Sequence, residues 1–259
     1  MNHGLGESMQ RWKVYPLLCS LLVGCVTVDE DGNKKEFNRI EASEARISLG
    51  LNYLESGQWQ RARDNLELAL KYAPDYYRAQ NAIAYYYQRV DEPEKAEAFY
   101  KEALRDSPKN GDIRNNYGVF LCRQERYDEA IVFFEKAIEQ PYYYLTSASY
   151  ENAGLCSLKS GNKAKAKGYF EKALSYDPYR PKSMLQLAQL EIDSQNLKEA
   201  RVMLFKFNKR YGYKVDSLWL LIRLEKQAGR FTQVDKYADL LKAQYPDSQQ
   251  YQKYLANEY

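Results

Sequence analysis

The sequence predicts an all-α fold, an α-solenoid of about six helix-turn-helix repeats wound into a right-handed superhelix. Small residues recur at intervals of 34, 34, 36 and 34, at Gly50, Ala84, Gly118, Gly154 and Ala188. A second series follows the same intervals, at Ala62, Ala96, Ala130, Ala166 and Ala200. The 13 glycines and 8 prolines are sparse in this chain of 259 residues and fall mostly at repeat boundaries, which favours helices. Such arrays bury helix against helix and leave a long curved surface for another polypeptide.

Composition excludes several classes of function. The 38 basic and 35 acidic residues are interleaved, which argues against a nucleic-acid partner. The one histidine, His3, lies at the extreme N-terminus, so imidazole catalysis and histidine-ligated metal are excluded for the folded part. The sequence has no glycine-rich phosphate loop and no cluster with metal-ligand spacing. We therefore expect a protein that is not an enzyme and takes no metal, no cofactor and no small-molecule substrate.

Residues 1–24 are predicted to be a secretory signal. Two basic residues, Arg11 and Lys13, precede an apolar run over 14–23 that is too short to cross a bilayer. The true start at Met1 or Met9 stays open. Residues 25–42 are predicted to be a flexible tether, because most of this stretch is polar.

The end of this signal, Leu22-Val23-Gly24-Cys25, resembles the lipobox of bacterial lipoproteins. The resemblance implies cleavage after Gly24 and a covalent lipid on Cys25, which anchors the chain to a membrane. The alternative is a plain cleaved signal with an incidental cysteine. In the lipoprotein family an aspartate after the cysteine favours the inner membrane. Here Val26 follows, so the resemblance implies an outer-membrane anchor, with the folded part in the periplasm of a Gram-negative bacterium.

The first repeat, residues 43–76, reads L-G-x-x-Y … A-x-x-x-L-x-x-A … P and resembles the tetratricopeptide signature. Its small residues Gly50 and Ala62 let the two helices approach closely, while Gly57 marks the turn between them. The repeats that follow are 77–110, 111–144, 147–180, 181–214 and 215–248, and the last two are weaker. Two extra residues around 145–146 lengthen the connection after the third repeat. Residues 249–259 are predicted to be a capping helix.

In this repeat type, positions 2, 5, 9 and 12 of the first helix line the concave surface. In the first repeat they give an apolar strip, Ile47, Leu51 and Leu54, which we predict to bind a protein partner. Tyr85 and the amides Asn115 and Asn116 flank it. The alternative is that the N-terminal tether folds back and covers the strip. Some relatives grip a C-terminal carboxylate with lysines on this surface. Those lysines are missing from the first three repeats, which disfavours an acidic tail as ligand there.

Two cysteines, Cys122 and Cys156, lie in the predicted repeats, late in the first helices of adjacent units. Adjacent first helices pack side by side, so an oxidising compartment allows a bridge between them. Two buried free thiols that act as small apolar residues are the alternative.

Three segments are more specific than the repeat signature: residues 115–121 (NNYGVFL), 151–155 (ENAGL) and 166–174 (AKGYFEKAL). Together with the lipobox and six repeats, they resemble the type IV pilus biogenesis lipoproteins called pilotins. The resemblance implies outer-membrane anchoring and binding of the pilus secretin subunit, whose outer-membrane localisation and multimerisation these proteins promote. Some neisserial members carry paired cysteines at the matching places, which supports a bridge. The alternative is a general outer-membrane scaffold that recruits cell-wall enzymes or other envelope proteins.

Overall fold

Antiparallel helix pairs account for most of the described chain. A computed structural model of the protein describes residues 37–258. Residues 39–259 form a compact unit of their own, distinct from residues 1–38. The predicted signal over 1–24, the cysteine Cys25 and most of the predicted tether lie outside the described residues. No helix within 37–258 is long and apolar enough to cross a bilayer.

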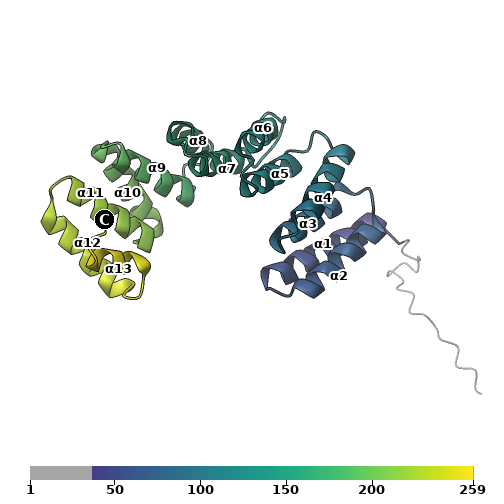
Figure 1. Cartoon of the computed structure of the whole chain (residues 1–259), viewed down its shortest axis with the longest axis horizontal. Helices are drawn as coiled ribbons and strands as arrows, with labels where there is room; N and C mark the ends of the chain where they lie inside the picture. The colour runs from purple at the N-terminus through teal and green to yellow at the C-terminus, as the bar shows by residue number, and fades with distance from the viewer. Residues whose placement is uncertain (1–36, 259) are drawn as a thin grey trace, which may run out of the picture. The chain divides into compact units, whose positions relative to one another are not determined.

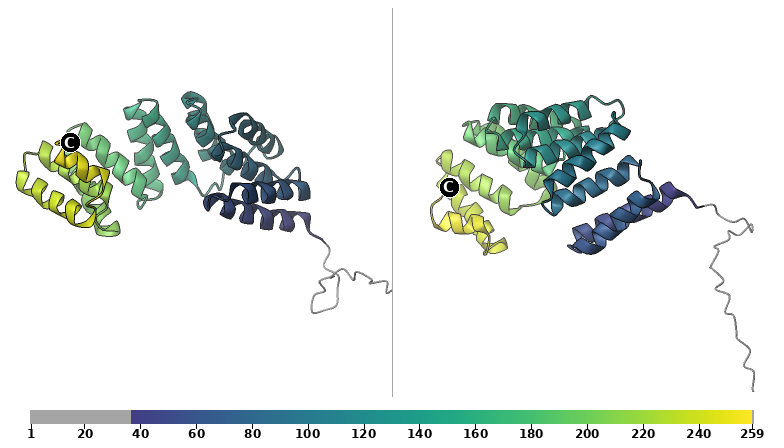
Figure 2. Two further views of the ribbon diagram at one scale, coloured as in Figure 1. Left: turned by 60° about the horizontal axis from the view of Figure 1, so that its bottom comes forward. Right: turned by 45° about the vertical axis from the view of Figure 1, so that its right-hand side comes forward.

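The described residues form 13 helices and no strands, and Figure 1 shows the helices following one another as hairpins. Their bounds are α1 Arg39–Glu55, α2 Trp59–Tyr72, α3 Tyr77–Arg89, α4 Pro93–Asp106, α5 Gly111–Arg123, α6 Tyr127–Ile138, α7 Thr146–Lys159, α8 Lys163–Tyr176, α9 Pro181–Asp193, α10 Leu197–Tyr211, α11 Val215–Gln227, α12 Phe231–Gln244 and α13 Gln249–Leu255. The two views in Figure 2 show the hairpins stacked side by side within this unit. The prediction of an all-α array of helical repeats is confirmed.

The structure changes two predicted boundaries. The tether was predicted to reach residue 42, but α1 begins at Arg39. Residues 39–42 contain neither glycine nor proline, and Glu41 places a negative charge in the first turn, where the helix dipole favours it. The capping helix was predicted to reach residue 259, but α13 ends at Leu255. Asn257 has φ 57°, a left-handed conformation that helices rarely continue through.

Close approach within a repeat depends on the small residues of the first helix. A Cβ atom added to Gly50 would lie 2.7 Å from Leu66 Cγ, and one added to Gly118 would lie 2.7 Å from Phe134 Cε1. Both distances are far inside van der Waals contact. The predicted role of Gly50 is therefore confirmed, and Gly118 and Gly154 play the same part in the third and fourth repeats. The alanines of the second series, Ala62, Ala96, Ala130, Ala166 and Ala200, are all fully buried.

The turn inside each repeat contains one residue in the left-handed region. These residues lie 34 or 36 positions apart, at Gly57, Asp91, Glu125, Gly161, Gln195 and Gly229, with φ between 60° and 80°. Glycine adopts this conformation without a Cβ penalty, whereas side chains rarely do. The last turn, at Gly229, shows that the sixth repeat keeps the geometry of the others although its sequence has drifted.

A partly buried polar cluster joins the second and third repeats. The carboxylate of Glu97 in α4 accepts hydrogen bonds from the Tyr117 hydroxyl at 2.8 Å and from Arg126 Nη1 at 2.9 Å. Lys101 Nζ lies 2.9 Å from the same oxygen. Burial alone would raise the pKa of Glu97, but these hydrogen bonds outweigh burial and lower it to about 2.

Acid is expected to remove the contribution of this cluster. Because the folded pKa of Glu97 is depressed, its stabilisation is fully present above the unfolded value and is lost as the pH falls through about 2. We expect Glu97→Gln to lower the urea midpoint clearly at about pH 7 and only slightly at about pH 2. Glu171→Gln, at an exposed carboxylate of α8, is the control and should have little effect at either pH. An equal loss at both pH values for Glu97→Gln would contradict this assignment.

Candidate functional site

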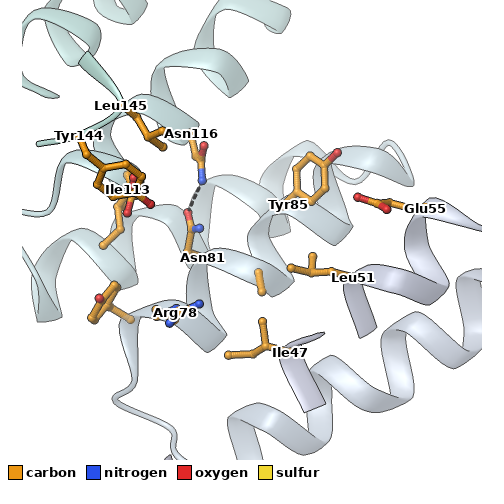
Figure 3. A pocket seen from close by; sticks show the side chains of 13 residues that line it. Ile47, Leu51, Glu55, Arg78, Asn81, Tyr85, Ile113, Asn116, Tyr144 and Leu145 are labelled. Carbon is orange, nitrogen blue, oxygen red and sulfur yellow. Dashed lines mark hydrogen bonds between the residues drawn. The ribbon is translucent and has the colours of Figure 1, made fainter. Parts of the chain in front are cut away.

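A pocket of about 450 Å³ opens between α1, α3, α5 and the connection before α7. Figure 3 shows its lining side chains. Its apolar part consists of Ile47, Leu51, Ala82, Tyr85, Ile113, Tyr144 and Leu145, and its polar part consists of Glu55, Tyr77, Arg78, Asn81, Asp112 and Asn116. We call it the N-terminal pocket. Mixed apolar and polar walls of this size suit side chains of a polypeptide.

The structure brings four of the six predicted partner-binding residues together here: Ile47, Leu51, Tyr85 and Asn116 line the N-terminal pocket. The other two predictions are wrong. The Leu54 side chain is 0 % exposed and Asn115 is only 8 % exposed, so neither offers a surface to a partner. Ile47 is also largely buried, so only a small part of its side-chain surface lines the pocket.

Packing between neighbouring first helices explains these corrections. Position 12 of the first helix, which is Leu54, Gln88 and Cys122 in the first three repeats, is buried in all three. Position 5 is buried as Ile47, Asn115 and Glu151 in the first, third and fourth repeats and half-exposed as Asn81 in the second. Because α1 also contacts α3, Ile47 and Leu54 are covered by neighbouring helices. The predicted strip is therefore not free over its whole length. Position 9, as in Leu51 and Tyr85, stays half-exposed.

Two charged residues of the pocket, Arg78 and Asp112, differ in whether they have an interaction partner. Arg78 Nη1 lies 3.0 Å from Glu44 Oε1, so this guanidinium is already paired. Asp112 Oδ1 is buried and accepts no hydrogen bond within the described residues. Burial raises the pKa of Asp112, and the positive charge of Arg78 opposes that rise only in part. An unsatisfied buried carboxylate oxygen is costly, so Asp112 Oδ1 lowers the stability of the fold around the pocket.

Side-chain amides form a relay that ends in the pocket. Asn152 in α7 donates to Asn115 Oδ1 at 3.0 Å, Asn115 donates to Asn116 Oδ1 at 3.4 Å, and Asn116 donates to Asn81 Oδ1 at 3.3 Å. Figure 3 draws the last of these bonds. Asn115 is therefore a buried link, and Asn116 and Asn81 lie at the pocket. An amide both donates and accepts, so it matches the alternating groups of an extended backbone.

Sequence reasoning missed Tyr144 and Leu145, which belong to the connection between α6 and α7. The only signal for them was the change of interval from 34 to 36 residues at this point of the chain. The Tyr144 side chain is 79 % exposed and forms one wall of the pocket, whereas its neighbour Tyr142 is fully exposed and does not line it.

A disulfide ties α5 to α7. It joins Cys122 and Cys156, with Cα atoms 5.8 Å apart, where the sequence had left a bridge and free thiols as alternatives. Between 37 and 258, no group of three or more histidine, cysteine or acidic residues is arranged to hold a metal ion.

Stacked helix hairpins with a repeat of about 34 residues, and a pocket between their first helices, define a tetratricopeptide repeat protein. Family models described as tetratricopeptide repeat match residues 47–110, 111–178 and 157–207.

Two relatives and two solved structures are closely similar. The type IV pilus assembly protein PilF of Pseudomonas aeruginosa is 36% identical over 241 residues, which cover 93% of this chain and 96% of the relative. An uncharacterised protein of Haemophilus influenzae is 38% identical over 120 residues, covering 46% of this chain and 67% of that protein. The structure of Pseudomonas aeruginosa PilF has a TM-score of 0.74, with 36% identity and coverage of 85% and 99%. The structure of PilW, a type IV pilus biogenesis factor, also has a TM-score of 0.74, with 29% identity and coverage of 82% and 98%. The chain therefore belongs to the PilF family of tetratricopeptide-repeat factors for type IV pilus biogenesis.

Proposed function

We propose that the protein is an outer-membrane lipoprotein that binds the secretin subunit of the type IV pilus and promotes its outer-membrane localisation and multimerisation. The observation that carries the proposal is similarity over almost the whole chain, 36% identity across 93% of its length, to a type IV pilus assembly protein. The lipid on Cys25 and the secretin as partner are parts of this proposal.

The proposed mechanism is physical, with no reaction. The N-terminal pocket offers apolar walls at Leu51 and Tyr144 and side-chain amides at Asn81 and Asn116. These groups suit an extended secretin segment that inserts an apolar side chain and donates a hydrogen bond. An acylated Cys25 would hold the bound subunit at the membrane, where tethering raises its local concentration beside other subunits.

Deleting the gene tests the assembly role. We expect the secretin of the deletion strain to form few heat-stable multimers in the outer membrane, and full-length protein supplied in trans to restore them. Cys25→Ser supplied in the same way should restore fewer, because the protein would lack its anchor. Normal multimers without the gene would refute the role. Pull-down that recovers only cell-wall hydrolases would favour the general scaffold instead.

A pair of tyrosine variants tests the pocket. Tyr144→Asp places a charge in its wall, so we expect secretin recovery in a pull-down to fall by about tenfold or more. Tyr142→Asp is the matched control, because Tyr142 is also exposed, lies two residues away and is outside the pocket. Circular dichroism should show unchanged helix content for both variants. Equal secretin recovery with both variants would mean that the N-terminal pocket is not the binding site.

A further inference from the structure

A second pocket, of about 510 Å³, lies farther along the array, between α5, α7 and the start of α9. Its apolar walls include Val119, Leu155 and Leu158, and the Cys122–Cys156 disulfide forms part of them. We call it the disulfide pocket. Leu155 and Leu158 remain half-exposed here, whereas position 12 of the first helix is buried in each of the three preceding repeats.

Three cations line the disulfide pocket: Arg123, Lys159 and Lys182. No acidic side chain lines it. None of the three forms a salt bridge or side-chain hydrogen bond with the residues of 37–258. The N-terminal pocket differs, because Arg78 there is paired with Glu44 and two carboxylates, Glu55 and Asp112, line the wall.

Helix stability explains two of these cations and leaves the third unexplained. Arg123 and Lys159 lie in the last turns of α5 and α7, where the helix dipole favours positive charge. Lys182 lies in the first turn of α9, where the dipole disfavours it. The positive charge of Lys182 therefore lowers the stability of α9 unless a negative group pairs with it.

The repeat register shows why Lys182 lacks a partner. Arg78 holds the same position in α3 and is paired with Glu44, 34 residues earlier. The residue 34 positions before Lys182 is Ala148, which has no charge. Asp216 shares a neighbouring pocket with Lys182, but no salt bridge joins them, and Asp216 accepts a hydrogen bond from Gln250 Nε2 at 2.9 Å.

We propose that the disulfide pocket is a second docking site, for an internal segment of a partner protein that carries an apolar side chain flanked by carboxylates. The apolar walls take the side chain, and Arg123, Lys159 and Lys182 pair with the carboxylates. Charge complementarity carries the proposal, because a pocket with three uncompensated cations repels basic segments and favours acidic ones. This site is separate from the N-terminal pocket and does not depend on the secretin as partner.

The probe is a fluorescent hexapeptide of alternating aspartate and leucine, acetylated and amidated so that it has no terminal charge. We expect fluorescence polarisation to show binding to the full chain that weakens as salt rises. Lys159→Glu with Lys182→Glu should weaken binding by about tenfold or more. Lys71→Glu with Lys242→Glu is the control, because it makes the same change in net charge at exposed lysines outside the pocket and should bind like the unmodified chain.

Two further measurements distinguish binding at the disulfide pocket from binding at the N-terminal pocket. Tyr144→Asp should leave peptide binding unchanged, and Lys159→Glu with Lys182→Glu should leave the helix content unchanged. The proposal is overturned if the capped peptide does not bind, if an asparagine–leucine peptide binds equally well, or if only a free C-terminal carboxylate is bound. A failure to bind the capped peptide would leave the secretin multimer experiment unaffected, so the two proposals fail separately.

Discussion

Replacing both Cys122 and Cys156 with alanine is expected to lower the free energy of unfolding by about 3–4 kcal/mol. The two residues are 34 positions apart, and a cross-link that closes a loop of this length removes much of the freedom of the unfolded chain. The connection that follows α6 is the long one, because α6 ends at Ile138 and α7 begins only at Thr146. The bridge from α5 to α7 spans this connection and holds the third repeat against the fourth.

Chemical denaturation of the purified chain, followed by circular dichroism, measures this effect. The matched control is the unmodified chain under a reducing agent, which should unfold at nearly the same denaturant concentration as Cys122→Ala with Cys156→Ala. If the free energies of unfolding of the oxidised and the reduced protein differ by less than about 1 kcal/mol, the expected stabilisation is contradicted.

Gly154→Val is expected to destabilise the fold by about 2–3 kcal/mol, because it overpacks a close contact between the two helices of the fourth repeat. A Cβ atom at position 154 would lie 2.7 Å from Phe170 Cε1 and 2.9 Å from Cζ. The Phe170 side chain is fully buried, so the ring has no free space into which it can withdraw. The helices α7 and α8 must then separate, and that separation exposes apolar surface.

Gly168→Val is the matched control, since Gly168 lies within α8 of the same repeat and a Cβ atom there meets nothing within 4 Å. Valine has a slightly higher helix propensity than glycine, so this variant should change the stability by less than about 0.5 kcal/mol. The unfolding midpoints of the two variants, measured side by side, separate close packing from helix propensity. Similar midpoints would show that the close approach of α7 and α8 at position 154 does not limit stability.

The fold could be predicted from the sequence because the residues that mark the helix contacts recur at a regular interval. Small residues such as Gly50 and Ala62 recur at a fixed phase, and each one marks a place where two helices touch. The turn positions follow the same period, so even the drifted sixth repeat was predicted correctly as helical.

The site was predicted only in part, because a rule that treats every repeat alike ignores what the next repeat covers. Leu54 and Asn115 hold positions assigned to the concave surface, yet packing against neighbouring helices buries them. Tyr144 lies in a connection with no period, so no pattern marked it as part of the pocket. The missing partner of Asp112 depends on contacts in three dimensions, which spacing along the chain does not reveal.

The most direct test of the central claim places a photo-reactive phenylalanine analogue at position 144 in living, piliated cells and irradiates them. If the N-terminal pocket holds a secretin segment, the secretin subunit is covalently attached to the protein at position 144 and not at position 142. Cross-links at position 144 to other proteins alone, or equal secretin attachment at both positions, would contradict the account.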